Sequence, residues 1–478
     1  MNKTLSIASR TLPIAAALVA FPATAQQVPN AQPDRAVSAQ DRFYTSDQFS
    51  NTVSVIDPST NTLLGVIKLG DPTPANLSPL YRGQLLVHGM GFSPDRRTLA
   101  VVSIGSNSVS FIDTATNAVK HTAYVGRSPH EAFFRPDGRE VWVSVRGEDY
   151  IAVLDGTTFK ETGRIAVPNG PGMTIFSPDG KYGYVCSSFS PETVVIDTRS
   201  KRIVGRVKQD SPFCPDIAAT PDGKQVWLTL KDVGRVMVFD AKPPFAVLKT
   251  IDTGPITNHV NIARTPKGQF AYVTVGTQNI VRVFRTDDFS EIASVPVGAL
   301  PHGLWPSGDG SRMYVGLEND DAVAVIDTAT NKVIATIPIG QGPQGVAYVP
   351  GAVPSGQGLD NLVPLAKAQG KVQVVLEGQG QSQVSLFDQG QVQILQAAVA
   401  GLAPKQTFTL GLAARQDGTG TVEPLAKFMT NPAGAAIVNA VGPIRQIVKD
   451  AAPAERRFLV IRSGAPDEAG AVVQRQKP

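Results

Sequence analysis

The chain has 478 residues, of which 42% are hydrophobic and 18% are charged, a balance that can bury a core and excludes a disordered chain or a multi-span membrane protein. Its formal net charge is +4, and no block of basic residues indicates a nucleic-acid partner. The 44 glycines and 37 prolines stay below the proportion typical of low-complexity chains.

Residues 1–25 have the pattern of a secretory signal peptide. Two basic residues precede the apolar run 12–21, which is too short to span a bilayer, and small residues end the segment at Ala25, before Gln26. We therefore expect cleavage near Ala25-Gln26 and a periplasmic or secreted protein of the cell envelope, without a membrane span. Residues 26–40 are polar and form a predicted linker.

One short phrase recurs along the chain. It is an alternating apolar run that ends in Asp in six of its seven copies: VSVID (53–57), VSFID (109–113), IAVLD (151–155), TVVID (193–197), VMVFD (236–240), VRVFR (281–285) and VAVID (323–327). After a first interval that an insertion at 71–87 lengthens, the copies are spaced by about 42 to 45 residues. That period is typical of a β-propeller, in which each repeat is one four-stranded blade.

A second phrase, of the form Ser-Pro-Asp-Gly, precedes the later copies and predicts a tight turn in each blade. Gly supplies the positive φ that such a turn requires, and apolar residues alternate on both sides. One position in the strand after the turn is mostly aromatic, and we expect its side chains to fill the wedge between blades: Ala100, Trp142, Tyr184, Trp227, Tyr272 and Tyr314.

The two ends of the repeat array complete one blade. Residues 41–70 contain three strand candidates, and residues 344–349 add an inner strand that has no partners nearby in the sequence. We therefore predict an all-β fold: a seven-bladed β-propeller over residues 41–350, with its N- and C-terminal strands interlocked in one blade.

These repeats resemble the YVTN-family β-propeller proteins. The similarity is carried by Tyr272-Val273-Thr274-Val275, by Pro301-His302-Gly303 and by the segment from Val323 to Ile339, and it covers about 310 residues. It implies a propeller of the cell envelope and is weak for function, because proteins with this fold have many roles.

The C-terminal part has a different pattern. Residues 351–363 form a Gly/Pro linker, and residues 364–474 contain seven alternating segments separated by turns. This pattern predicts a small Ig-like β-sandwich, and GLAPKQTFTLGLA is similar to a strand of bacterial domains of that type. We expect an adhesion or docking module, because no motif in it carries chemistry.

Histidines gather at one position of the repeat. Counting back from each turn, the residues that begin the inner strands are His88, His130, Gly172, Pro215, Val260, His302 and Gln344, with His259 one residue away. This position lies at one mouth of the central channel. Loops on the same face add charged residues, so the predicted ligand-binding residues are His88, His130, His259, His302, Gln344, Glu131, Arg146, Asp216, Lys231 and Glu318.

Two interpretations of the histidines are open. In the favoured one, Pro-His-Gly belongs to the repeat itself and each histidine bonds a neighbouring blade. In the other, His88, His130 and His302 bind copper or zinc, which imidazole suits. His302 lies several blades from the other two, so a shared ion would need water in its shell.

Cys186 and Cys214 are the two cysteines of the chain, and an exported protein meets an oxidising compartment. Cys186 lies late in the second strand of one blade, and Cys214 precedes the inner strand of the next. We expect a disulfide between adjacent blades; a Cys/His metal pair and two buried thiols are the alternatives.

The leading functional hypothesis is a non-catalytic binding or scaffold protein that presents the loop-rich channel mouth to a small ligand or to an unknown envelope protein. We expect it to be a monomer and to need no cofactor. The alternatives are a redox-metal propeller of the copper type and a lactonase- or lyase-like propeller. Nucleic-acid binding is not expected, because the mature chain has a net charge of about +2 and no basic stripe.

Overall fold

The computed structural model describes residues 35–70, 85–366, 372–388, 393–442, 444, 452, 455–468 and 470–477. The predicted signal peptide and most of the insertion at 71–87 lie outside the described residues. No helix in the described part of the chain is long and apolar enough to cross a membrane.

Seven four-stranded antiparallel sheets form the blades of a propeller. The strands of each blade are given from the innermost outward. Blade one is formed by β28 (Pro343–Val349), β1 (Arg42–Asp47), β2 (Thr52–Asp57) and β3 (Thr62–Lys68), and blade two by β4 (Val87–Phe92), β5 (Thr98–Ser103), β6 (Ser108–Asp113) and β7 (Val119–Tyr124). Blade three is formed by β8 (Pro129–Phe134), β9 (Glu140–Val145), β10 (Tyr150–Asp155) and β11 (Glu161–Ala166), and blade four by β12 (Pro171–Phe176), β13 (Tyr182–Ser187), β14 (Glu192–Asp197) and β15 (Arg202–Lys208).

The remaining three blades follow the same order. They are β16 (Ile217–Ala219), β17 (Gln225–Leu230), β18 (Arg235–Asp240) and β19 (Val247–Asp252); β20 (Thr257–Thr265), β21 (Gly268–Val275), β22 (Ile280–Arg285) and β23 (Glu291–Pro296), with the 3-10 helix η1 (Gly276–Gln278) after β21; and β24 (Pro301–Pro306), β25 (Arg312–Leu317), β26 (Ala322–Asp327) and β27 (Lys332–Pro338). The predicted seven-bladed propeller is confirmed.

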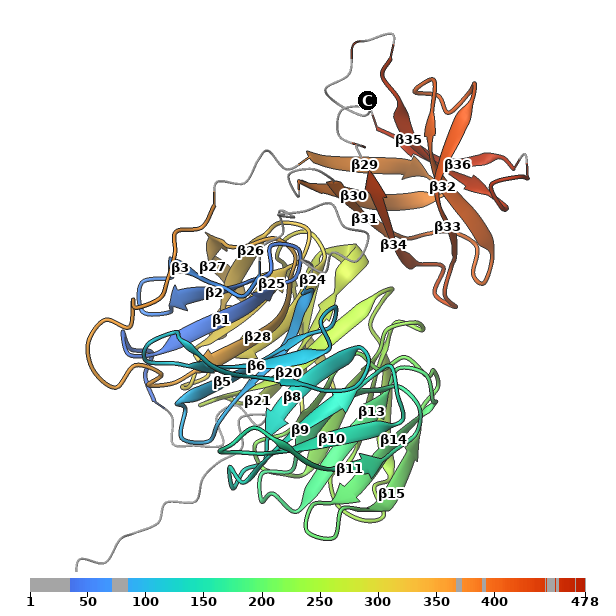
Figure 1. Ribbon diagram of the computed structural model, residues 1–478. Helices are drawn as coiled ribbons and strands as arrows, with labels where there is room; N and C mark the ends of the chain where they lie inside the picture. Colours follow the sequence, from blue (N-terminus) through green and yellow to red (C-terminus); the bar gives the residue numbers. More distant parts are fainter. Residues whose placement is uncertain are drawn as a thin grey trace, which may run out of the picture.

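The ring closes by pairing the two ends of the propeller, as the sequence predicts. Strand β28 pairs antiparallel with β1, with Arg42 opposite Val349 and Thr45 opposite Val346. Figure 1 shows the blue strands of blade one next to β28, which comes about 300 residues later in the chain.

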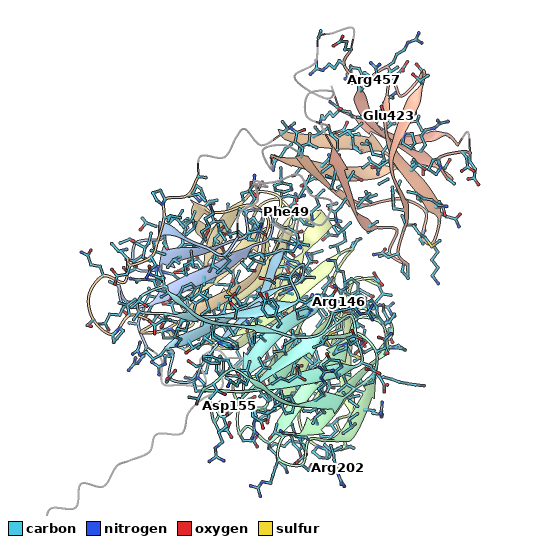
Figure 2. The ribbon with its side chains drawn as sticks, in the orientation of Figure 1. Phe49, Arg146, Asp155, Arg202, Glu423 and Arg457 are labelled. Atoms are coloured by element: carbon cyan, nitrogen blue, oxygen red, sulfur yellow. A yellow bond between two sulfur atoms is a disulfide. The ribbon has the colours of Figure 1, made fainter. Side chains whose placement is uncertain are left out.

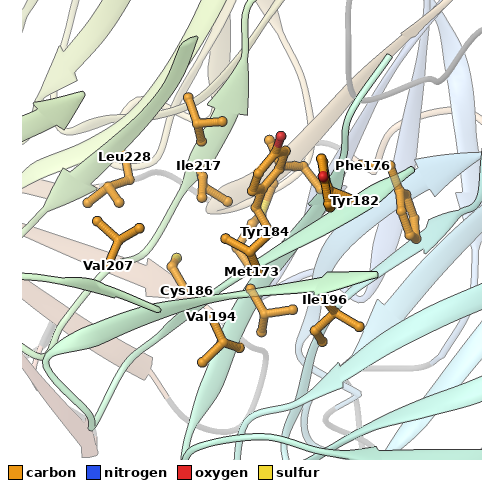
Figure 3. Close-up of a cluster of buried hydrophobic side chains, with 14 of the residues drawn as sticks. Met173, Phe176, Tyr182, Tyr184, Cys186, Val194, Ile196, Val207, Ile217 and Leu228 are labelled. Carbon is orange, nitrogen blue, oxygen red and sulfur yellow. The ribbon is translucent and has the colours of Figure 1, made fainter. Parts of the chain in front are cut away.

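Large side chains fill the wedges between blades. Trp142, Tyr184 and Trp227 are fully buried, as expected for the aromatic column. The hydroxyl of Tyr184 also donates a 2.6 Å hydrogen bond to the carbonyl of Ala241 in the next blade. Figure 3 shows this wedge, where Tyr184 and Val207 of blade four lie beside Ile217 and Leu228 of blade five.

The turns at one end of the blades satisfy their own polar groups, and we call this end the turn face. In the turn after β10, one carboxylate oxygen of Asp155 accepts hydrogen bonds from the amides of Thr157 and Thr158 and from the Thr158 hydroxyl. The Ser-Pro-Asp-Gly turns behave alike, because Ser177 donates to Asp179 and Gly180 takes the positive φ of 69°.

The C-terminal domain, residues 372–477, is one antiparallel sheet of eight strands. In spatial order it is formed by β33 (Val422–Met429), β32 (Thr407–Ala413), β35 (Phe458–Ser463), β36 (Val472–Gln476), β29 (Val372–Gly378), β30 (Gly380–Asp388), β31 (Gln393–Val399) and β34 (Ala436–Gly442). The end strands β33 and β34 approach each other, so the sheet curls around its own core into a nearly closed, sandwich- or barrel-like domain. The all-β domain is as predicted, but its strands belong to one sheet.

Cys186 and Cys214 form a disulfide in the structure, and both are fully buried. Cys186 lies on β13 of blade four, and Cys214 lies just before β16 of blade five. The bond therefore ties two adjacent blades together.

Candidate functional site

The inner strands begin with an irregular step that brings two consecutive residues to the channel mouth. In six of the blades the strand register shifts at this point, just before Met90, Glu131, Met173, Val260, Leu304 and Val346. The first ring of equivalent positions is His88, His130, Gly172, Pro215, Asn258, His302 and Gln344. The second is Gly89, Glu131, Met173, Asp216, His259, Gly303 and Gly345.

One position of the first ring differs from the expectation. The sequence count placed Val260 there, but Thr257 pairs with Val275 as Pro301 pairs with Leu317, so Asn258 is the equivalent of His302. The cause is the hairpin between β20 and β21, which is two residues longer than its counterparts. His259 consequently shares the ring of Glu131 and Asp216.

The four histidines form a continuous line of buried rings. The ring centroids lie 4.3 Å apart for His88 and His130, 6.2 Å for His88 and His302, and 4.5 Å for His259 and His302. His302 is thus much nearer to His88 than its place in the sequence suggested, because a seven-bladed ring converges on a narrow axis. Burial lowers the pKa of all four, to about 3 for His88 and His259, so the imidazoles are neutral at pH 7.

The histidines of the first ring point their Nδ1 atoms toward backbone carbonyls of the following blade. Nδ1 of His130 lies 2.9 Å from the carbonyl oxygen of Gly172, to which the neutral ring donates. His88 and His302 face the carbonyls of His130 and Gln344 in the same sense, although their Nδ1 atoms fall outside normal hydrogen-bond geometry. His130 therefore makes the predicted bond between blades, whereas His88 and His302 only approach it. In all three residues the contact uses Nδ1, so Nε2 is available to bind a ligand.

Two carboxyl groups lie beneath the histidines. Glu131, Asp216 and His259 line a small cavity of about 30 Å³ together with apolar residues such as Phe133 and Trp305. Burial raises the pKa of Asp216 to about 8, and burial together with the nearby Asp216 raises that of Glu131 well above its ordinary value. Asp216 lies 3.6 Å from Nδ1 of His259 and accepts the amide of Val260.

The C-terminal domain covers this mouth. Gln396 of β31 donates a 2.7 Å hydrogen bond to Glu318, and Gln373 of β29 bonds the Asn319 carbonyl and the Asp320 carboxylate at 2.7 and 2.9 Å. Apolar contacts support these bonds: Ile256 and Leu300 of the propeller cluster with Ala398 and Ala435 of the domain, and Phe49 packs on Phe387. Figure 1 shows the domain on one side of the propeller, next to the yellow-green blades.

Two cations lie at the covered mouth. Arg146, which follows β9 of blade three, lies over the rings of Phe189 and Phe213, at 5.6 and 5.3 Å from their centroids. Lys231, which follows β17 of blade five, lies 5.7 Å from the centroid of the Phe213 ring. The charge of Arg146 contributes to the low pKa of both His88 and His130. In Figure 2, Arg146 and Phe49 lie on the side that faces the C-terminal domain, and Asp155 and Arg202 lie away from it.

Arg146 has no polar partner among the residues that the structure describes. None of them accepts a hydrogen bond from its guanidinium or forms an ion pair with it, and its Nε is buried without a partner. Burial accordingly lowers its pKa. Lys231 is likewise without an ion pair within 4 Å in the described part of the chain, although Glu318 attracts it from farther away and partly offsets the effect of burial on its pKa.

All ten residues predicted for the channel mouth gather there. The residues that the sequence analysis missed are Asn258, hidden by the longer hairpin, together with Asn319 and Gln396. Glu318 accepts the amide of Gln396 and contacts Gln344, so the covering domain contributes to the site. The repeat pattern could not reveal this contribution, because Gln396 lies outside the repeats.

Comparison with known proteins places the fold. The sequence model of a family described as YNCE-like beta-propeller matches residues 6–353. No curated protein matches the chain. Among solved structures, Kuenenia stuttgartiensis hydrazine synthase is 21% identical, with 57% of this chain and 92% of that chain covered and a TM-score of 0.50. A functionally unknown protein from Desulfotomaculum acetoxidans is 14% identical, with 64% and 98% covered and a TM-score of 0.54. At these identities the two structures share the fold alone.

Proposed function

Because the chain belongs to the YNCE-like β-propeller family, and a propeller fold alone assigns no activity, we propose from its site that it is a binding protein that holds a small anion at the covered channel mouth. Arg146 and Lys231 would bind the anion, with the C-terminal domain as the cover. We further propose that it works in the cell envelope. The signal-like segment 1–25 and the disulfide between Cys186 and Cys214 support that location.

The observation that carries the proposal is the unpaired guanidinium of Arg146. Arg146 is half-buried, and a cation largely removed from water without a partner is costly in general, so such cations are normally paired. Buried and half-buried arginines of this chain follow that rule: Arg42 donates to two backbone carbonyls, and Arg282 bonds Glu291. An oxyanion at Arg146 would supply the missing partner.

The surroundings favour a compact oxyanion such as a carboxylate, phosphate or sulfate. A guanidinium offers a planar fork of donors that matches two oxygens, and Lys231 adds a second cation on the same aromatic ring.

The test is a ligand-stabilisation series on the full mature protein, in a buffer free of oxyanions. We expect acetate, citrate, inorganic phosphate or sulfate to raise the melting temperature saturably, by mass action on the folded state, and calorimetry to give one site. Arg146→Met should abolish the shift. The matched control is Arg164→Met, because Arg164 also stacks on an aromatic ring, Tyr150, but pairs with Glu161 at the surface.

Two outcomes would overturn the proposal. One is the absence of a saturable shift with all four anions. The other is a shift of equal size in wild type and Arg146→Met, which would place the anion elsewhere on the surface.

A further inference from the structure

We infer that His88, His130 and Glu131 form a site for a divalent transition-metal ion, deeper in the channel than the anion site and built from other residues. The three residues come from two adjacent inner strands, β4 and β8. One ligand atom from each lies within 4.8 Å of the other two, and all three residues are buried. This set differs from the three-histidine set of the sequence analysis, because Glu131 takes the place of His302.

The orientation of His130 is typical of a metal ligand. Its Nδ1 donates to the carbonyl of Gly172 at 2.9 Å, which leaves Nε2 as a bare electron-pair donor, and Oε1 of Glu131 lies 3.9 Å from Nδ1 of the same ring. Metal-binding histidines usually have such a partner on the second nitrogen, because it fixes the ring plane and raises the basicity of the ligand. For His88, no described residue bonds Nδ1 with normal geometry.

Gly89 opens the space that Glu131 needs. Glu131 reaches from β8 toward β4 and accepts the amide of Met90. A Cβ on Gly89 would overlap the Glu131 carboxylate and the carbonyl oxygen of His130. The second-ring position of β4 must therefore lack a side chain for the carboxylate to stand beside the two imidazoles.

The ligand chemistry favours zinc or copper. Two imidazoles and one carboxylate are a common set for these ions, and bonds of about 2.0 to 2.2 Å would draw the three groups together by small side-chain movements. Three protein ligands leave at least one coordination position open toward the channel. Arg146 stands near enough to lower the pKa of both histidines, so its charge would oppose a bound cation when no anion is present.

The test is metal binding by the full mature protein, purified without a His tag and treated with a chelator. We expect one Zn²⁺ per chain by calorimetry, and a Cu²⁺ electron paramagnetic resonance spectrum with hyperfine coupling to two imidazole nitrogens. His130→Ala and the isosteric Glu131→Gln should each weaken Zn²⁺ binding at least tenfold. His121→Ala is the matched control, because His121 lies on the outermost strand β7, and it should bind like wild type.

The same experiment separates this site from the anion site. Arg146→Met should keep the metal site and bind Zn²⁺ severalfold more tightly in oxyanion-free buffer, whatever the outcome of the anion series. Stoichiometric binding that survives in Glu131→Gln and His130→Ala would overturn the inference, as would the absence of binding in wild type. A loss in His302→Ala as large as in His130→Ala would also overturn this ligand set.

Discussion

The turn face and the channel mouth are built from the same seven repeats, yet their charged side chains differ: those of the turn face are hydrogen-bonded within their own turns, and those of the mouth include buried groups with shifted pKa values. At the turn face, the carboxylate of Asp155 accepts three hydrogen bonds from its own turn, and Asp197 is bonded by Ser200 in the same manner. At the mouth, equivalent positions carry different residues, among them His130, Gly172 and Asn258. Positions that repeat serve the fold, and positions that vary between copies can serve a ligand.

The pKa values separate the two faces. Hydrogen bonds from Thr158 lower the pKa of the exposed Asp155, whereas burial raises that of Asp216 to about 8. A carboxyl with a raised pKa contributes stability below its ordinary pKa and loses it as pH rises toward the folded value. A carboxyl with a lowered pKa does the reverse. The two faces should therefore respond to pH with opposite signs, in different ranges.

The largest expected effect is the loss of stability with rising pH. In metal-free buffer, the folded protein must give up the Asp216 proton between about pH 6.5 and 8.5, which costs about 2 kcal/mol of unfolding free energy. Asp216→Asn should remove that loss relative to wild type, as measured by urea unfolding at both pH values. Glu131 and His259 face Asp216, and the pKa of Glu131 is also raised, so the informative quantity is the difference between the two proteins.

Asp155→Asn provides the turn-face control for that experiment. Asp155 is already ionised throughout this range, so the variant should show the pH slope of wild type at a lower stability. An unchanged slope in Asp216→Asn would contradict the raised pKa and remove the difference between the two faces.

Removal of a turn carboxylate should have the next largest effect. Asp155→Ala abolishes three hydrogen bonds to one ionised group, and we expect a measurable loss of stability in urea unfolding. Zn²⁺ and anion binding should not change, because the turn lies at the far end of the blade. Asp149→Ala, at the exposed mouth end of the same blade, should stay within about 0.5 kcal/mol of wild type.

Removal of Arg146 should have the smallest effect on stability, with the opposite sign. Without ligand, Arg146→Met discards an unpaired cation and keeps the packing on Phe189 and Phe213, so stability should rise by about 1 kcal/mol. Arg282→Met should lower it, because Arg282 bonds Glu291 and two backbone carbonyls. A marked destabilisation by Arg146→Met would show that the guanidinium has a partner and is not kept for a ligand.

Most of the propeller could be predicted from the sequence. The period of the VSVID-like phrase predicted four-stranded blades, and the unpaired strand at 344–349 predicted how the ring closes. Both predictions were possible because strand pairing and turn chemistry within a blade are local and repeat. The curled single sheet of the C-terminal domain was harder, since alternation identifies strands without stating which ones pair. A sandwich and a nearly closed sheet share the same alternating pattern.

The candidate site was predictable where it follows the repeat. His88, His130 and His302 could be placed at the mouth by counting from the turns, and the same count failed in blade six because its hairpin is longer. Distances across the ring depend on closure, so the approach of His302 to His88 could not be read from spacing. The contact of Gln396 with Glu318 depends on docking between domains, which no local pattern encodes.

The pairing of β28 with β1 also fixes the order in which the site can be assembled. During synthesis from the N-terminus, the ring stays open until Gln344 arrives with β28, and only the residues after it can supply Gln396 and the cover. The channel mouth is therefore complete only when β28 has paired with β1 and the C-terminal domain has docked on the propeller.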